Sequence, residues 1–272
     1  MDDTRSAAIV EDIVAGLRDV IRRHRVTYAE YRSALQFLAG IVEEGELPLL
    51  SDVLFEALID EVAQLDSEGG TDSNVEGPFY VAGAPLSDAD GVTPVLSMRS
   101  EEPGDRLLFT GAVRSTTGAA LPSAVIDVWQ ANGDGLYSQF APGLPEWNLR
   151  GRIRCDADGK FSFVTVVPAA YDIPRHPRTG RVLDLLRLKP HRPAHIHFKV
   201  DAPGHLRLTT QVYFASDPWL DQDVVGAVKP SLVTELHKAT DTDNYAYTCR
   251  FDFALSQNPK EPADQSHGAV VT

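Results

Sequence analysis

Two histidines in this chain have the spacing of a metal-binding pair. His195 and His197 lie in the stretch Arg-Pro-Ala-His-Ile-His-Phe at positions 192–198. Side chains on a β-strand alternate between its faces, so residues two apart point to the same side, where both imidazoles can reach one metal ion. A polar strand face without a metal produces the same pattern, so the histidines need support from elsewhere in the chain.

Two tyrosines upstream provide that support. Tyr137 ends a glycine-bearing loop, Ala-Asn-Gly-Asp-Gly-Leu-Tyr, and Tyr171 lies in a loop bracketed by prolines, Pro-Ala-Ala-Tyr-Asp-Ile-Pro. Binding groups often lie on loops that a rigid scaffold positions. One such tyrosine is more often a packing residue, but two such loops together with the His-x-His stretch are a rarer combination.

The composition indicates a globular protein that does not bind polyanions. The 272 residues are 43% hydrophobic and 24% charged, and the net charge of −14 argues against nucleic acid and anionic membranes as partners. The first residues lack the layout of a signal peptide, and no stretch approaches the ~18 apolar residues of a membrane span. Cys155 and Cys249 fit reduced packing residues. We therefore expect a cytoplasmic protein.

The N-terminal part of the chain, up to Gly69-Gly70, is predicted to be helical. Apolar residues between positions 9 and 21 recur at spacings of three and four, which is typical of an amphipathic helix. Thr27 and Glu30 form a predicted capping box for a second helix that ends near Gly45. Ser51 or Asp52 is expected to cap a third helix.

The rest of the chain is predicted to consist mainly of short strands. A linker rich in Gly, Pro, Ser and Asp covers 77–98, and the tail from Gln257 is expected to be disordered or surface-bound. Hairpin turns are predicted at 117–118 and 156–159. Six runs of β character at this spacing predict a β-sandwich, at residues 107–113, 124–130, 160–167, 194–200, 208–214 and 247–255.

Several motifs occur in an order that resembles a known family. They are Glu76-Gly77-Pro78-Phe79-Tyr80, Asp127-Val128-Trp129-Gln130, Asp134-Gly135-Leu136-Tyr137, Arg150-Gly151-Arg152, the stretch 192–198 and Thr209-Thr210-Gln211. From about Val26 to Phe253 the sequence resembles the intradiol ring-cleaving dioxygenases, in the branch of catechol, chlorocatechol and hydroxyquinol 1,2-dioxygenases. The expected fold is mainly β, with an N-terminal α-helical dimerisation region and linker (1–102), a β-sandwich catalytic domain (103–256) and a tail (257–272).

The resemblance implies one ferric ion per subunit, held by Tyr137, Tyr171, His195 and His197. Phenolates are hard anionic donors that favour Fe(III), whereas structural zinc sites use Cys and His. By similarity to the family, Tyr137 stays bound to the iron. Tyr171 is displaced by the substrate and accepts one of its protons.

The implied reaction splits a catechol-type ring between its two hydroxylated carbons with O2 and gives a cis,cis-muconate-type product. Arg192 is expected to stabilise negative charge on the reacting ring, and Gln211 to hydrogen-bond in the same region. Two other classes of protein are less well supported by the sequence. A binding module that had lost its metal would lack a ligand, and a zinc hydrolase would need a carboxylate near the histidines.

The substrate pocket follows from the same resemblance. Asp52 is the discriminating residue, because chlorocatechol- and hydroxyquinol-type members carry an acid there, although a helix cap is the competing interpretation. By position, the pocket is expected to be lined by Leu49, Asp52, Val53, Val75, Gly77, Phe79 and Val225.

The choice among substrates stays open. Stretches 49–54, 128–130 and 228–232 are most similar to the hydroxyquinol enzymes, whereas 137–138 and 210–211 are closer to the catechol and chlorocatechol enzymes. We expect hydroxyquinol or catechol as substrate, with chlorocatechol as the alternative.

The resemblance also gives the N-terminal helices a role beyond core packing. It implies a homodimer formed through these helices and an apolar tunnel between them that is able to hold a phospholipid.

Overall fold

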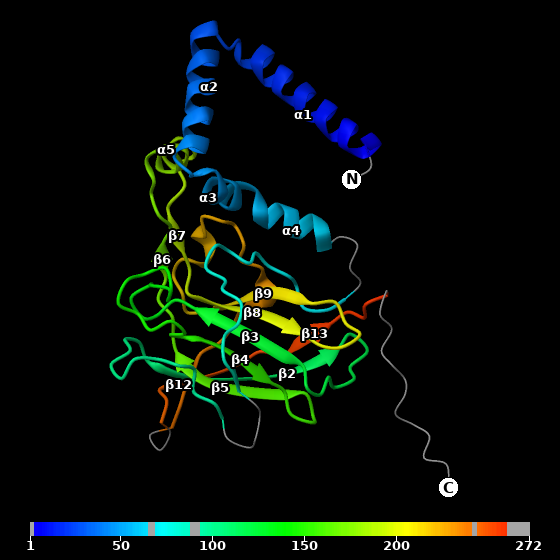
Figure 1. Ribbon diagram of the computed structural model, residues 1–272, viewed down its shortest axis with the longest axis vertical. Helices are drawn as coiled ribbons and strands as arrows, with labels where there is room; N and C mark the ends of the chain where they lie inside the picture. The colour runs from blue at the N-terminus through cyan, green and yellow to red at the C-terminus, as the bar shows by residue number, and fades with distance from the viewer. Residues whose placement is uncertain (1–2, 65–68, 88–92, 241–243, 260–272) are drawn as a thin grey trace.

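The computed structural model describes residues 3–64, 69–87, 93–240 and 244–259, and within these it consists of a β-sandwich with a helical region at the N-terminus (Figure 1). The predicted fold class is therefore confirmed. Residues 88–92 of the predicted linker and 260–272 of the predicted tail lie outside the described ranges. None of the helices formed by the described residues has the length and apolarity that a bilayer crossing requires.

Two sheets form the sandwich. One has the strand order β1-β4-β3-β8-β9-β10, and the other β11-β12-β2-β13 with β5 also paired to β2. The strands of the first are β1 (Leu86–Ser87), β3 (Val125–Gln130), β4 (Arg150–Arg154), β8 (His195–Asp201), β9 (Leu208–Phe214) and β10 (Val233–Thr234). Those of the second are β2 (Arg106–Ser115), β5 (Lys160–Val166), β11 (His237–Lys238), β12 (Tyr247–Arg250) and β13 (Phe253–Leu255).

Aromatic side chains fill the space between the sheets. Phe109 stacks on Phe163, with 5.2 Å between ring centroids, and lies equally far from Phe198 of the other sheet. Ile196 and Phe198 are fully buried in this core. Because side chains alternate along β8, His195 and His197 face the opposite side of the strand, as the sequence predicted.

Helices cover one end of the sandwich (Figure 1). They are α1 (Asp3–His24), α2 (Tyr28–Glu43), α3 (Leu47–Ser51), the π-helical turn η1 (Asp52–Glu56) and α4 (Ala57–Gln64). The capping box is confirmed, since Glu30 N donates to Thr27 Oγ1 and Thr27 N donates to Glu30 Oε2 at 2.8 Å. The second helix ends at Glu43, just before Gly45, which adopts a φ of +72°.

The predicted cap of the third helix is wrong. Helix α3 begins four residues before Ser51, after Glu46, and continues through η1, so Ser51 and Asp52 lie inside a helical segment. Asp52 therefore has no capping role, and its carboxylate is available for another function.

The turn at 156–159 forms, with Gly159 N donating to Asp156 O, but it does not close a hairpin. It joins β4 to β5, which belong to different sheets. The turn at 117–118 closes only the isolated bridge between Arg114 and Ala120. A turn motif determines the backbone conformation of a few consecutive residues, whereas side-chain packing determines which strands pair.

Three short elements near the histidines were not predicted. Strands β6 (Tyr171–Asp172) and β7 (His191–Arg192) pair with each other, and α5 (Pro177–Leu186) lies between them in sequence. The short 3-10 helices Leu220–Gln222 and Pro230–Leu232 follow β9. The run 247–255 is split into β12 and β13, which both pair with β2.

Candidate metal centre

Three of the four predicted ligands converge at the outer face of β8. The Nε2 atoms of His195 and His197 are 3.0 Å apart. The hydroxyl of Tyr137 lies 3.2 Å from Nε2 of His197 and 3.5 Å from Nε2 of His195. All three side chains are at least 97% buried, since their exposed fractions are 1%, 1% and 3%.

The imidazole of His195 presents a lone pair to this point. Nδ1 of His195 lies 2.7 Å from the carbonyl of Pro193, so Nδ1 carries the proton and Nε2 is free to bind a cation. Burial, followed by the charge of Arg192, lowers the pKa of His195 to about 3. Burial also lowers the pKa of His197 well below its ordinary value. Neutral imidazole is the form that ligates metals.

The ring of His197 is oriented by stacking. It lies on Trp129, the residue opposite it in the β3–β8 register, with centroids 4.7 Å apart and planes inclined by 12°. Its Nδ1 is buried and has no hydrogen-bond partner among the described residues. The ring plane is thus fixed by packing rather than by a second hydrogen bond.

Tyr171 completes the group from a different element. Its ring centroid lies 5.6 Å from that of Tyr137 and 5.7 Å from that of His195. Gly135 permits this approach, because a Cβ there would come within 2.9 Å of the Tyr171 Cβ, and its φ of +78° suits glycine. The glycine-bearing loop thus lets the two tyrosines approach each other.

The residues present suit a hard, positively charged metal ion. Burial and the neighbouring Tyr171 raise the pKa of Tyr137 well above its ordinary value, so its phenolate requires a local positive charge. Among the described residues, no three His, Cys, Asp or Glu side chains form a metal-binding cluster. The two imidazoles and two phenols are the donor set that this part of the chain offers, and phenolate oxygens favour Fe(III).

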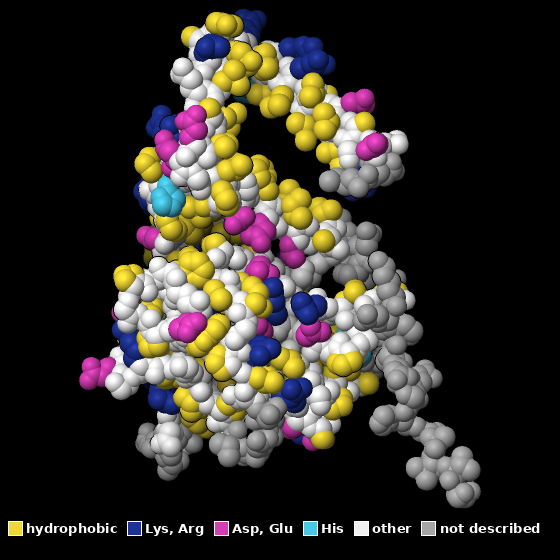
Figure 2. Space-filling model, viewed as in Figure 1, with side chains coloured by type: hydrophobic (Ala, Val, Ile, Leu, Met, Phe, Trp, Pro, Cys, Tyr) yellow, Lys and Arg dark blue, Asp and Glu magenta, His cyan; other side chains and the backbone are white. Residues whose placement is uncertain are grey.

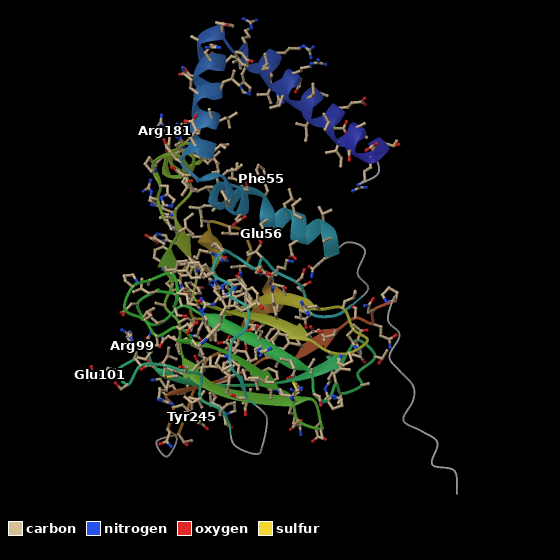
Figure 3. All side chains as sticks on the ribbon, viewed as in Figure 1. Phe55, Glu56, Arg99, Glu101, Arg181 and Tyr245 are labelled. Atoms are coloured by element: carbon tan, nitrogen blue, oxygen red, sulfur yellow. The ribbon has the colours of Figure 1, made fainter. Side chains whose placement is uncertain are left out.

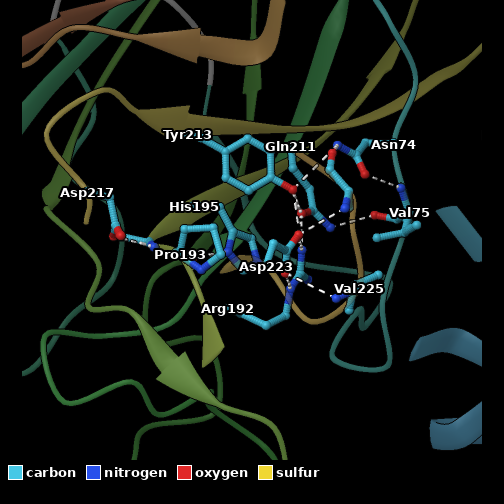
Figure 4. Close-up of polar contacts among 12 residues, drawn as sticks. Asn74, Val75, Arg192, Pro193, His195, Gln211, Tyr213, Asp217, Asp223 and Val225 are labelled. Atoms are coloured by element: carbon cyan, nitrogen blue, oxygen red, sulfur yellow. Dashed lines mark hydrogen bonds and ion pairs between the residues drawn. The ribbon is translucent and has the colours of Figure 1, made fainter. Parts of the chain in front are cut away.

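A network of hydrogen bonds holds the guanidinium of Arg192 in place (Figure 4). Arg192 faces Tyr171 in the β6–β7 register. Its guanidinium donates to Gln211 Oε1 at 3.0 Å and to the Tyr213 hydroxyl at 3.3 Å, and it pairs with Asp223 at 3.1 Å. The sequence did not single out Tyr213 or Asp223, and neither carries a spacing signal, since long-range pairing brings them here.

A cavity of about 200 Å³ opens next to Tyr171 and Arg192. All seven residues predicted for the substrate pocket line it: Leu49, Asp52, Val53, Val75, Gly77, Phe79 and Val225. Five further residues line it that were not predicted, namely Glu56, Pro78, Ile173, Pro174 and His176. Glu56 and Pro78 carried usable signals, because Glu56 lies four residues after Asp52 on the same helical segment and Pro78 lies between the predicted residues Gly77 and Phe79.

The cavity has mainly apolar walls and one arginine, and it lies next to the candidate metal centre. These features define a small-molecule enzyme pocket rather than a macromolecular interface. The comparisons with known proteins agree. The family described as "Dioxygenase" matches residues 75–257, and the one described as "Catechol dioxygenase N terminus" matches residues 3–71.

Individual relatives span nearly the whole chain. A chlorocatechol 1,2-dioxygenase from Rhodococcus opacus is 40% identical over 95% of this chain and 100% of that protein. A catechol 1,2-dioxygenase 2 from Acinetobacter lwoffii is 41% identical over 86% of each chain. The solved structure of a hydroxyquinol 1,2-dioxygenase from Pseudomonas putida DLL-E4 has a TM-score of 0.87 at 31% identity, over 95% of this chain and 94% of that one.

The chain belongs to the intradiol ring-cleaving dioxygenases of the catechol, chlorocatechol and hydroxyquinol 1,2-dioxygenase branch. It is an oxidoreductase that cleaves catechol-type rings with O2, and its family uses non-haem iron.

Proposed function

We propose that Tyr137, Tyr171, His195 and His197 hold one ferric ion per subunit, and that a catechol-type diol is opened there between its hydroxylated carbons to a cis,cis-muconate-type product. The convergence of two neutral imidazole Nε2 atoms on the Tyr137 hydroxyl, 3.0–3.5 Å apart, carries this proposal. When bound, the ferric ion supplies Lewis-acid activation of the diol.

The chain's own residues perform the other tasks. Tyr171 lies at the cavity wall, where its phenolate can accept a proton from a diol hydroxyl. Arg192 faces the same cavity with its charge fixed by Asp223 and Gln211, so it is oriented toward negative charge that develops on the ring. The apolar walls exclude water, which strengthens that interaction.

The size of the cavity supports a single-ring substrate. A cavity of ~150 Å³ is able to take up benzene, so about 200 Å³ accommodates one ring with small substituents. The proposed binding residues are the seven predicted ones, with Asp52 on the wall rather than at a helix cap. Hydroxyquinol and catechol fit this pocket. Chlorocatechol is the alternative, and the names of several relatives support it.

The visible absorption spectrum of the iron-loaded protein tests the proposed site. We expect a tyrosinate-to-iron charge-transfer band that shifts when a diol is added without O2. Tyr137→Phe should lose most of the band, whereas Tyr28→Phe, at a side chain that is 77% exposed, should keep it. An iron-loaded protein without colour would contradict the two-tyrosinate site.

The proposed assembly is a homodimer formed through α1 and α2, with a phospholipid as a further ligand between the helices. Both helices expose large apolar side chains, and α1 buries none of its residues against the rest of the chain (Figure 2). Cys155 and Cys249 are unpaired and buried, which supports a reducing compartment such as the cytoplasm.

A further inference from the structure

A second acid faces the substrate cavity. Asp52 and Glu56 are the first and last residues of η1, and both line the cavity together with Tyr171 and Arg192. Figure 3 marks Glu56 on this segment, at the junction of the helices with the sandwich. Two carboxyl groups four residues apart in a helical segment lie on one side of it. Short π-helical segments of this kind are often found at functional sites.

Contacts with a neighbouring segment hold the side chain of Glu56 in place. Its side chain is partly buried, and backbone hydrogen bonds from Glu76 and Gly77 reach its carboxylate. Gly77 lies beside the candidate metal centre, since a Cβ there would be 3.5 Å from Cε1 of His197. Glu56 is thus fixed against the segment that separates it from the histidines.

The charges around the cavity do not cancel. Arg192 is compensated by Asp223, with which it forms a buried ion pair. Asp52 and Glu56 add two acids, and the other titratable groups on the wall are Tyr171 and His176. Burial raises the pKa of both carboxyls, and the charge of Asp52 raises that of Glu56 further, while the backbone hydrogen bonds and Arg192 oppose this rise. The cavity therefore has surplus acceptors and no unpaired cation.

The surplus of hydrogen-bond acceptors determines which substituents of a bound ring are favoured. The remaining walls are mainly apolar, so the two carboxylates are the strongest acceptors that a substituent donating a hydrogen bond can meet there. A halogen or alkyl group there leaves desolvated carboxyls without donors. An anionic substituent is repelled by like charge.

We propose that Glu56, as a second acid beside Asp52, is a specificity-determining residue of this pocket, and that it shifts the selectivity toward ortho-diols whose ring carries a hydrogen-bond donor, a hydroxyl or an amino group, and away from halogenated and carboxylated ones. This inference rests on the proposed function of the cavity as the diol site.

The test is a panel of dissociation constants for the iron-loaded protein, measured by calorimetry without O2. The ligands are catechol, hydroxyquinol, 4-aminocatechol, 4-chlorocatechol and protocatechuate. The unmodified protein should bind the two donor-bearing diols roughly tenfold or more tightly than 4-chlorocatechol, and protocatechuate weakest. Tighter binding of 4-chlorocatechol or protocatechuate than of both donor-bearing diols would overturn the inference.

Glu56→Gln removes the charge and keeps an oxygen for the backbone hydrogen bonds. It should reduce the preference for donor-bearing diols about tenfold. It should also bring the dissociation constant of protocatechuate closer to those of the other diols. Glu61→Gln, the same change at an exposed position of α4, should leave every ratio as it was. Steady-state kcat/KM ratios for the same diols should move in parallel with the dissociation constants.

Failure of this inference can be told apart from failure of the proposed function. If Glu56→Gln keeps the iron colour and cleaves rings with unchanged ratios, Glu56 does not set specificity and the diol site stands. If the unmodified protein neither develops the colour nor binds any diol, the proposed function itself falls.

Discussion

At the scale of single residues, the carboxylate of Asp223 compensates the buried charge of Arg192. Both are almost fully buried, with side-chain exposures of 4% and 2%. Asp223 also accepts hydrogen bonds from the backbone of Ala227 at 3.0 Å and of Val225, which lines the cavity. The carboxylate thus ties the arginine to the wall of the substrate site, so its loss should affect both stability and catalysis.

Removal of Asp223 leaves a buried guanidinium without its counterion. Asp223→Ala is expected to lower the free energy of unfolding by about 3–5 kcal/mol, measured by urea denaturation. Asp201→Ala is the matched control, because its partner Arg207 and its own side chain are 64% and 47% exposed, and it should cost less than ~1 kcal/mol. Equal decreases in the free energy of unfolding in the two variants would show that the buried ion pair stabilises the protein no more than the exposed one.

The same ion pair predicts that the free energy of unfolding decreases at acidic pH. Burial alone would raise the pKa of Asp223, but the charge and hydrogen bonds of Arg192 outweigh it, so the folded-state pKa lies below the ordinary value. The contribution of Asp223 is therefore complete above pH ~4, the unfolded value, and is lost as pH falls through the folded-state pKa. Asp223→Asn should make this decrease smaller in denaturation curves between neutral and acidic pH, and an unchanged slope would contradict the assignment.

At the scale of elements, α5 is held by a residue of a distant segment. His176 is its N-cap but makes no side-chain capping bond. Instead, the buried carboxylate of Glu46 accepts hydrogen bonds from the backbone of Arg178 and from both N and Oγ1 of Thr179, the latter two at 2.7 and 2.8 Å. Because His176 lines the cavity, this long-range cap also fixes one of its walls.

Limited trypsin digestion tests this cap. Glu46→Ala leaves the first amides of α5 without acceptors, so cleavage after Arg181 (labelled in Figure 3) and Arg187 should accelerate, and KM should rise more than kcat falls. Glu44→Ala is the control, since it removes only a partly exposed ion pair with Arg178. Equal cleavage rates in the two variants would show that Glu46 does not stabilise the start of α5.

At the scale of the whole molecule, α1 and α2 project beyond the sandwich as an arm with exposed apolar side chains (Figures 1 and 2). On α1, Ile13 and Leu17 are 57% and 60% exposed, and on α2, Leu38 is 58% exposed. Apolar patches of this extent mark interaction surfaces, and a lone amphipathic helix is marginal in water unless its apolar face is packed. A second copy of the chain is the proposed partner.

A charge on this face should break the dimer. Leu17→Asp is expected to shift the protein toward monomer in sedimentation equilibrium, because a buried carboxylate at an interface lacks a partner. Ala15→Asp adds the same side chain on the other side of α1 and should leave the assembly intact. A monomeric unmodified protein, or dimers of equal strength in both variants, would contradict the proposed interface.

Local patterns in the sequence were sufficient for features that depend on neighbours along the chain. Alternation along 194–200 placed His195 and His197 on one face, and the Thr27–Glu30 spacing located a helix start, because strand period and capping involve only a few consecutive residues. Only the tertiary structure decided which strands pair and what surrounds the site. It assigned β4 and β5 to different sheets, decided between the two interpretations of Asp52 in favour of the cavity wall, and brought Asp223 to Arg192, since these contacts join segments far apart in sequence through packing.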